Sequence, residues 1–168
     1  MRTGELLLED TSITYHNAKP SQITDDVLQQ ILALIENGQQ VSMTRVSNNL
    51  RRAEMIGYAK FNDDIVGVMV LKNPNPNYRK KVFAEVPDLI EKYPYELGYV
   101  YVIPKYRGQG TASYLLNELV GNRSDVFATT REDNTKMISL LKQNSFVQAG
   151  NTRKSDRGTY GIVLWIKK

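Results

Sequence analysis

The feature that most constrains the fold is an apolar strand that runs directly into a glycine-bearing loop and then into a helix. The strand is expected over residues 97–102, the loop carries Gly108 and Gly110, and the helix is expected over residues 111–120. In such a loop consecutive backbone N–H groups turn inward, glycines let a ligand approach the main chain, and the helix N-terminus adds its positive end. This arrangement predicts an anion site, and a pyrophosphate is its natural occupant.

Two familiar phosphate loops do not fit this segment. The P-loop pattern is absent, and the dinucleotide pattern G-x-G-x-x-G fails because Ser113 stands where the third glycine is needed. The spacing that does fit is [QR]-x-x-G-x-[GA], filled by Arg107, Gly110 and Ala112 and preceded by the run V-x-P-x-x-R-G that starts at Val102. On its own the hexapeptide is weak, but together with the strand before it the pattern is quite specific.

This loop resembles the acetyl-CoA signature of the GCN5-related N-acetyltransferases, the GNAT superfamily. A second segment is similar to that family in register: a strand over residues 125–130, then Asn134, an amphipathic helix and Phe146. The hairpin expected over residues 55–71 also resembles the second and third strands of the family. The resemblance covers roughly residues 24–168, and the insertion at residues 73–95 has no assigned counterpart.

The resemblance implies a mixed α/β fold, with six or seven strands, about four helices and a sheet that splays near its fourth and fifth strands. Acetyl-CoA would be the co-substrate, its pantetheine pairing with the strand edge at Val100, Tyr101 and Val102. Its pyrophosphate would meet the N–H groups of Arg107, Gly108, Gln109, Gly110, Thr111, Ala112 and Ser113. Asn134 would contact the pantetheine, cap its own helix, or do both.

Hydrophobic periodicity and turn residues predict the remaining elements. Helices are expected over residues 24–37, 42–52, 111–120 and 134–143, with a short one around 87–92, and strands over residues 12–15, 55–61, 65–71, 97–102, 125–130, 146–149 and 159–166. The run Asn73-Pro74-Asn75-Pro76-Asn77 is expected to break the pattern and open a polar insertion. The 168 residues fit a single acetyltransferase-like domain spanning the whole chain.

The composition narrows the chemistry. With no cysteine there is no thiol nucleophile, and with one histidine a multi-histidine metal site is excluded, so no metal is expected. The net charge of +4 allows an anionic cofactor or a polyanionic partner but is too small to argue for nucleic acid alone. No segment resembles a signal peptide or a membrane anchor, so we expect a cytoplasmic protein without a membrane partner; a homodimer is compatible with the sequence.

Glu96 is the candidate general base. It lies six residues before Val102 and shares the face of that residue under the alternation of a regular strand, with Tyr99 and Tyr101 on the opposite face. Histone-type members of the family carry a glutamate at the matching place; the alternative is a solvated carboxylate at a strand end. The tyrosine that acts as general acid in the family is replaced here by Leu141, so the thiolate leaves unassisted or an acid comes from elsewhere.

These observations predict an N-acetyltransferase that moves an acetyl group to a primary amine, on a small molecule or a peptide, by direct attack in a ternary complex. Carboxylates and tyrosines of the insertion would hold a cationic amine, or would form a solvated loop: Glu85, Asp88, Glu91, Tyr93, Tyr95 and Glu96. A catalytically inactive acyl-CoA-binding relative is the alternative. A nucleic-acid module on the helices at residues 24–52 is not supported, since no aromatic platform interleaves with their arginines.

Overall fold

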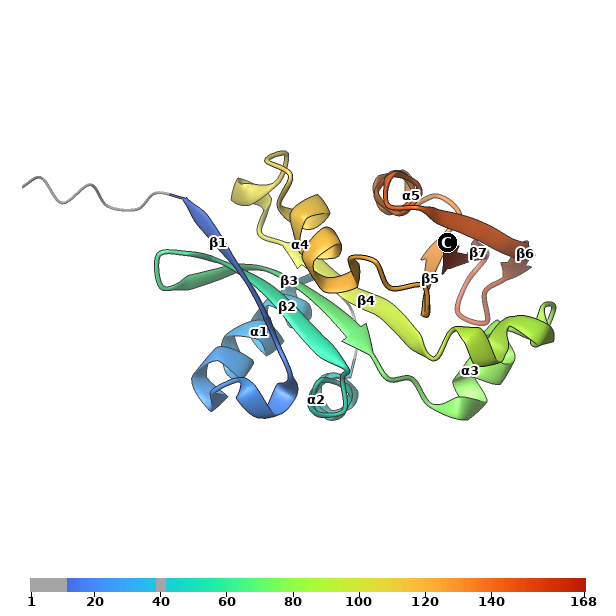
Figure 1. Ribbon diagram of the computed structural model, residues 1–168, viewed down its shortest axis with the longest axis horizontal. Coiled ribbons are helices and arrows are strands. Elements are labelled where there is room, and N and C mark those ends of the chain that lie inside the picture. Colours follow the sequence, from blue (N-terminus) through green and yellow to red (C-terminus); the bar gives the residue numbers. More distant parts are fainter. Residues whose placement is uncertain (1–11, 39–41) are drawn as a thin grey trace, which may run out of the picture.

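The computed structural model describes residues 12–38 and 42–168, and this part of the chain forms a seven-stranded sheet flanked by helices (Figure 1). The strands are β1 (Ile13–Ala18), β2 (Met55–Phe61), β3 (Asp64–Lys72), β4 (Tyr95–Val102), β5 (Val126–Arg131), β6 (Phe146–Lys154) and β7 (Gly161–Lys167). Their order in the sheet is β1-β2-β3-β4-β5-β7-β6. All neighbours are antiparallel except β4 and β5, which run parallel. The mixed α/β fold with a mixed sheet is the one expected from the sequence.

Five α-helices connect these strands in the described residues: α1 (Asp25–Gly38), α2 (Met43–Arg51), α3 (Pro76–Val82), α4 (Thr111–Val120) and α5 (Thr135–Gln143). Three 3-10 turns join them, at η1 (Pro20–Gln22), η2 (Pro87–Lys92) and η3 (Pro104–Tyr106). Helix α4 begins and ends where the sequence predicts, because Gly110 and Gly121 flank a run with buried Leu115, Leu116 and Leu119.

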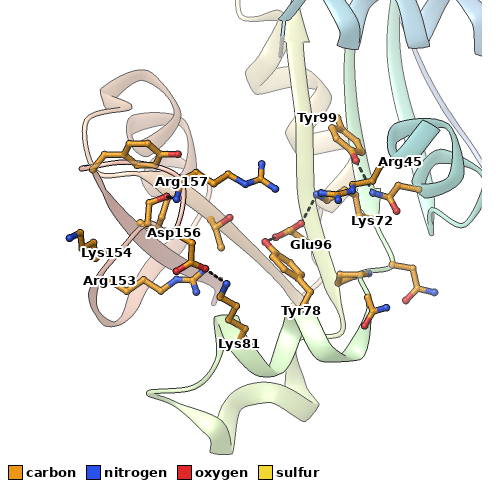
Figure 2. Close-up of a pocket in the computed structure, with 18 of the residues that line it drawn as sticks. Arg45, Lys72, Tyr78, Lys81, Glu96, Tyr99, Arg153, Lys154, Asp156 and Arg157 are labelled. Atoms are coloured by element: carbon orange, nitrogen blue, oxygen red, sulfur yellow. Dashed lines mark hydrogen bonds and ion pairs between the residues drawn. The ribbon is translucent and has the colours of Figure 1, made fainter. Parts of the chain in front are cut away.

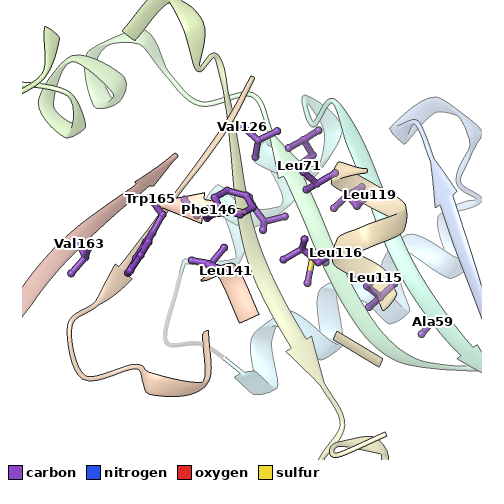
Figure 3. Packing of buried hydrophobic residues seen from close by; sticks show 14 of the residues in the cluster. Ala59, Leu71, Leu115, Leu116, Leu119, Val126, Leu141, Phe146, Val163 and Trp165 are labelled. Atoms are coloured by element: carbon purple, nitrogen blue, oxygen red, sulfur yellow. The ribbon is translucent and has the colours of Figure 1, made fainter. Parts of the chain in front are cut away.

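Three apolar clusters hold the layers together. Helices α1 and α2 bury Ile31, Ile35 and Leu50 on one face of the β1–β4 half of the sheet. Helix α4 packs on the opposite face of that half, and this cluster continues to Leu141 of α5 and Trp165 of β7 (Figure 3). The two halves of the sheet therefore share one continuous core on the α4–α5 side.

The insertion at residues 73–95 supplies the third cluster, which the sequence did not predict. Phe83 is fully buried and lies edge-on to Phe127 of β5, with ring centroids 5.1 Å apart. Tyr93 is also buried in this cluster, against residues of β5 and β7. The insertion is thus a packed layer on the β5–β7 half rather than a solvated loop.

Helix α3 is the element that the sequence analysis missed. The run Asn73 to Asn77 ends β3 as expected, but Pro76 then occupies the first turn of a helix, where a missing N–H costs nothing. The Asn75 side chain caps this helix by accepting a hydrogen bond from the Asn77 N–H at 2.8 Å. A proline-asparagine cluster that looks like a break is therefore also a helix start.

Candidate active site

The sheet opens between β4 and β5. These parallel strands pair only at Tyr95 with Val126 and at Glu96 with Phe127, and then diverge (Figure 1). Beyond Glu96 the edge of β4 that faces β5 has no strand partner in the described residues, while its other edge stays paired with β3 as far as Val102. An uncovered strand edge is a ready template for an extended ligand. The predicted contact residues Val100, Tyr101 and Val102 lie on this open stretch.

The glycine loop that follows β4 leaves a run of backbone donors free. Gly108 and Gly110 both adopt left-handed backbone, with φ of 76° and 77°, and a Cβ atom at either position would meet nothing within 4 Å. Within the described chain, the N–H groups of residues 108–113 have no hydrogen-bond acceptor, and the first helical bond of α4 comes from Tyr114 N–H to the Gly110 carbonyl. Free N–H groups beside open space at a helix N-terminus suit an anion.

Two side chains of the loop have structural tasks. The Arg107 Nε donates to the Val102 carbonyl at 2.8 Å and so ties the loop back to the end of β4. Thr111 is buried, and its hydroxyl donates to the Tyr106 carbonyl at 3.3 Å. At Thr111 a pyrophosphate could therefore use the backbone N–H without the side chain. The Arg107 N–H already donates to the Pro104 carbonyl at 3.2 Å, so the donor predicted at Arg107 is not free. Gln109, Ala112 and Ser113 contribute N–H groups to the same run.

Asn134 stands immediately before α5. Its Oδ1 accepts a hydrogen bond from the Met137 N–H at 3.2 Å, which is an ordinary N-cap. The side chain is exposed. The capping role expected from the sequence is present, and contact with a cofactor remains a prediction.

A bulge in β4 changes which side chains share a face. Gly98 pairs with Val70 and Tyr101 with Val68, so Tyr99 and Val100 together oppose a single residue of β3. Tyr99 takes up the extra residue with a φ of 50°.

The face assigned to Glu96 from the sequence is therefore wrong. Val100 and Val102 pack on the α4 side, whereas Tyr99 and Tyr101 pack on the α1–α2 side. Glu96 lies on that second side with the two tyrosines, because an inserted residue reverses the alternation after it.

Glu96 is buried and held by two neighbours. Its Oε1 lies 2.6 Å from the Lys72 Nζ, and its Oε2 accepts a hydrogen bond of 2.6 Å from the Tyr78 hydroxyl. Lys72 also lies over the Tyr99 ring, 4.6 Å from its centroid, and the Tyr99 hydroxyl accepts from Asn49 at 2.8 Å.

The surroundings of Glu96 shift the pKa values of its two partners, Lys72 and Tyr78. Burial alone would lower the pKa of Lys72, but the charge and hydrogen bond of Glu96 outweigh it, so the pKa is raised and Lys72 stays cationic. Burial and the negative charge of Glu96 raise the pKa of Tyr78 far above its ordinary value, so its phenol stays protonated. Two smaller effects oppose this rise, a hydrogen bond with Thr129 and the positive charge of Arg153.

A cavity of about 660 Å³ opens over Glu96 and its partners Lys72 and Tyr78 (Figure 2). Its floor is formed by Glu96 and Tyr99 of β4 with Thr129 of β5, which are residues on both arms of the opening in the sheet. Its walls come from α2, from the segment that joins β3 to α3, and from the β6–β7 hairpin. Cationic side chains dominate the walls: Arg45, Arg52, Lys72, Lys81, Arg153, Lys154 and Arg157.

The carboxylates of the insertion do not form the cationic-amine site that the sequence suggested. Of that set only Glu96 lines the cavity. Tyr93 belongs to the core, and the Glu85 Oε2 accepts a hydrogen bond from the Asn151 N–H at 3.1 Å. The residues that sequence reasoning missed are Tyr78 and the cavity arginines, which come from separate parts of the chain and follow no local motif.

Leu141 occupies the position where the family resemblance places a tyrosine. It is fully buried in the apolar cluster beside Phe146 and Trp165 (Figure 3), and its apolar side chain supplies no proton donor at this position.

Across residues 12–38 and 42–168, no three histidine or acidic side chains gather as metal ligands. Within the same residues no helix is long and apolar enough to cross a membrane.

The model of the acetyltransferase (GNAT) family matches residues 24–146 of this chain, which includes the glycine loop, the opening in the sheet and Glu96. The chain belongs to the GNAT family of acetyltransferases and is an acyltransferase of that type. A comparison with curated protein sequences finds no match.

Solved structures share the fold at low sequence identity. ElaA from Escherichia coli superposes with a TM-score of 0.67 at 11% identity, covering 94% of this chain and 100% of its own. The ribosomal-protein-S18-alanine N-acetyltransferase from the same organism gives 0.65 at 15% identity, covering 92% and 93%. The NatC complex bound to Gag peptide and CoA gives 0.67 at 15% identity, covering 93% and 98%.

Proposed function

We propose that this protein transfers the acetyl group of acetyl-CoA to a primary amine by direct attack in a ternary complex. The observation that carries the proposal is the uncovered edge of β4, which runs from the free N–H groups of the glycine loop to the cavity at Glu96. One extended thioester and one amine can thus approach the same strand from its two ends. With no cysteine in the chain, a covalent thioester intermediate on the enzyme is excluded.

Acetyl-CoA would lie with its pyrophosphate on the N–H groups of residues 108–113 and its pantetheine along Val100 to Val102. The left-handed glycines and the open space beside them support this placement. It needs no metal, because the loop donors and the N-terminus of α4 supply the positive field.

Glu96 would accept the proton of the attacking amine, directly or through a water molecule. An aliphatic amine has a pKa near 10, so at neutral pH it arrives as an ammonium and must lose a proton before it attacks. Each oxygen of Glu96 holds one partner and retains acceptor capacity, since a carboxylate accepts about four hydrogen bonds. As the C–N bond forms, the proton passes to Glu96 and the C–S bond breaks.

The bulge of β4 would stabilise the oxyanion. A bulge leaves one residue outside the strand ladder, and at Tyr99 and Val100 this happens beside the opening between β4 and β5. A backbone N–H aimed at a developing negative charge is an effective catalytic group. The leaving thiol has an ordinary pKa near 8.5, so the thiolate can depart without a tyrosine at position 141.

The loop assignment is tested by a matched pair of variants, Gly110→Asp and Gly110→Asn. Both side chains have the same shape and both tolerate left-handed backbone, so the pair isolates the negative charge. We expect the aspartate variant to lose detectable acetyl-CoA binding in calorimetry and the asparagine variant to retain much of it. An aspartate variant that folds and binds acetyl-CoA as tightly as the parent would show that the anion cradle lies elsewhere.

A further inference from the structure

The cavity above Glu96 carries far more positive than negative charge. Seven cationic and two acidic side chains line it. The two acids are already paired, Glu96 with Lys72 and Asp156 with Lys81. The whole chain has a net charge of only +4, so the excess at this one cavity is a local feature and not a general property of the surface.

Five cations remain without an acidic partner in the described part of the chain: Arg45, Arg52, Arg153, Lys154 and Arg157. Arg45 of α2 stands on one side of Glu96, and Arg153, Lys154 and Arg157 of the β6–β7 hairpin stand on the other (Figure 2). Arg52 directly follows the last residue of α2. Like charges that converge on one cavity repel one another, and an anion placed between them removes that repulsion.

The charge of the hairpin reaches the reaction centre. Arg153 is half-buried, and its positive charge acts on the Tyr78 hydroxyl that donates to Glu96. On the opposite wall Arg52 donates to the Asn49 Oδ1 at 3.1 Å, and Asn49 in turn holds the Tyr99 hydroxyl. The α2 wall is therefore linked to the floor by hydrogen bonds, and the hairpin wall by the charge of Arg153.

Building on the proposed function, we propose that the acceptor is a small primary amine that carries a phosphate or carboxylate group. Its amino group lies at Glu96, and its oxyanion lies between the guanidinium groups of α2 and those of the β6–β7 hairpin. Arginine presents a planar fork that matches both oxyanions, and such charge-assisted hydrogen bonds are the strong ones. Glu96 and the phenol of Tyr78 on the cavity floor keep the amine end distinct from the anion end.

The cavity is separate from the loop assigned to acetyl-CoA. Glu96 and Tyr99 lie in the first part of β4, whereas the glycine loop follows its last residue. None of residues 107–113 lines the cavity. The cationic walls are therefore available to the acceptor while CoA is bound.

The test measures binding to the CoA-saturated protein by calorimetry, so that it does not depend on turnover. The probes are two matched pairs that differ in charge: O-phosphoethanolamine against ethanolamine, and β-alanine against β-alaninamide. We expect the anionic member of a pair to bind about tenfold more tightly or better, and raising the salt concentration to reduce that preference. The larger of the two preferences identifies phosphate or carboxylate as the oxyanion that the site takes.

Variants locate the effect. Arg52→Gln and Arg153→Gln should each reduce affinity for the anionic probe about tenfold, while Arg51→Gln, which neutralises the neighbouring arginine that does not line the cavity, should change it less than twofold. Acetyl-CoA affinity should be unchanged in all three variants. With the preferred anionic amine and acetyl-CoA as substrates, the rate of CoA release should then show a raised KM and a much smaller change in kcat in the two cavity variants.

Three outcomes would overturn the inference: equal binding of charged and neutral probes, no binding of either anionic probe at millimolar concentration, or a parallel loss of acetyl-CoA affinity in Arg52→Gln and Arg153→Gln. The last would assign the cavity to the cofactor. Failure of the proposed function looks different, because acetyl-CoA would then fail to bind the parent protein, or would bind it without any release of free CoA when the amine is added.

Discussion

At the scale of single residues, the chemistry centres on one buried carboxylate. Glu96 is only 2% exposed, and Lys72 beside it provides the compensating charge. Removing one member of a buried ion pair strands the other, which costs more than the pair itself contributes. A variant of Glu96 therefore changes two things, the proton acceptor and the neutralisation of Lys72, and the two must be separated.

Glu96→Gln should lower kcat about 100-fold or more, within the usual range for loss of a general base. The loss should shrink as the pH rises, because more of the acceptor then arrives as the free amine. We expect no alkaline fall in rate from Tyr78, whose pKa is raised, or from position 141, where Leu141 has no proton to donate. Steady-state rates of CoA release from pH 6 to 10 provide the measurement.

Lys72→Met is the matched control for this prediction. It breaks the same ion pair but keeps the carboxylate, so we expect a comparable fall in melting temperature with a much smaller fall in kcat. Tyr78→Phe, which removes only one hydrogen bond to Glu96, should also reduce kcat less than Glu96→Gln does. Equal losses of kcat in Glu96→Gln and Lys72→Met would reduce Glu96 to a structural partner of Lys72.

At the scale of elements, two backbone irregularities on one segment form the site. The bulge at Tyr99 shifts the alternation of β4, and the loop after it uses two left-handed glycines before α4 begins. The first irregularity is occupied by a tyrosine, which needs support from its neighbours, here the packing of its ring and the hydrogen bond with Asn49. The second uses glycine, because Gly108 and Gly110 are exposed and no neighbouring atom would pack against a side chain there to support left-handed backbone.

Gly108→Ala should therefore lower the free energy of unfolding by about 1 kcal/mol, because the Cβ atom of alanine crowds the following carbonyl oxygen in left-handed backbone. Gly108→Asn should cost less than half of that, since asparagine tolerates the same φ. Urea denaturation of the two variants provides the comparison. If the alanine variant is as stable as the parent, the loop relaxes easily and the left-handed φ of 76° is not required.

At the scale of the whole molecule, the sheet is joined at its centre by a short seam. Strands β4 and β5 share two residue pairs, and the rest of the junction depends on the apolar cluster around Leu141 and on the packed insertion. A ligand bound along the open edge of β4 and at the N-terminus of α4 would add hydrogen bonds to both elements and so stabilise this part of the fold.

Acetyl-CoA at about 100 times its dissociation constant should stabilise the folded protein by roughly 2.7 kcal/mol. For a chain of this size that corresponds to a rise in melting temperature of about 5–11 °C, which a thermal melt resolves easily. The Gly110→Asp variant is the control and should show no such rise. An unchanged melting temperature of the parent protein at millimolar acetyl-CoA would contradict the cofactor assignment.

What the sequence determined by itself is local. The glycine loop, both ends of α4, and the N-cap at Asn134 were predictable, because each depends on residues within one or two turns of the chain. The hairpin of β2 and β3 was predictable for the same reason, since its register follows from a short turn. The family resemblance rests on these same segments.

The tertiary structure decided everything that depends on residues far apart in the chain. The bulge that places Glu96 on the same face as Tyr99 and Tyr101 is visible only in the pairing of β4 with β3, because periodicity alone cannot reveal an inserted residue. Tyr78 reaches Glu96 because α3 folds back over the sheet, and the cationic cavity unites residues 45–52 with residues 153–157. These cationic side chains, about a hundred residues apart in the sequence, line one cavity only because the chain folds. The positive electrostatic potential of the cavity is therefore a property of the tertiary structure and not of any single segment.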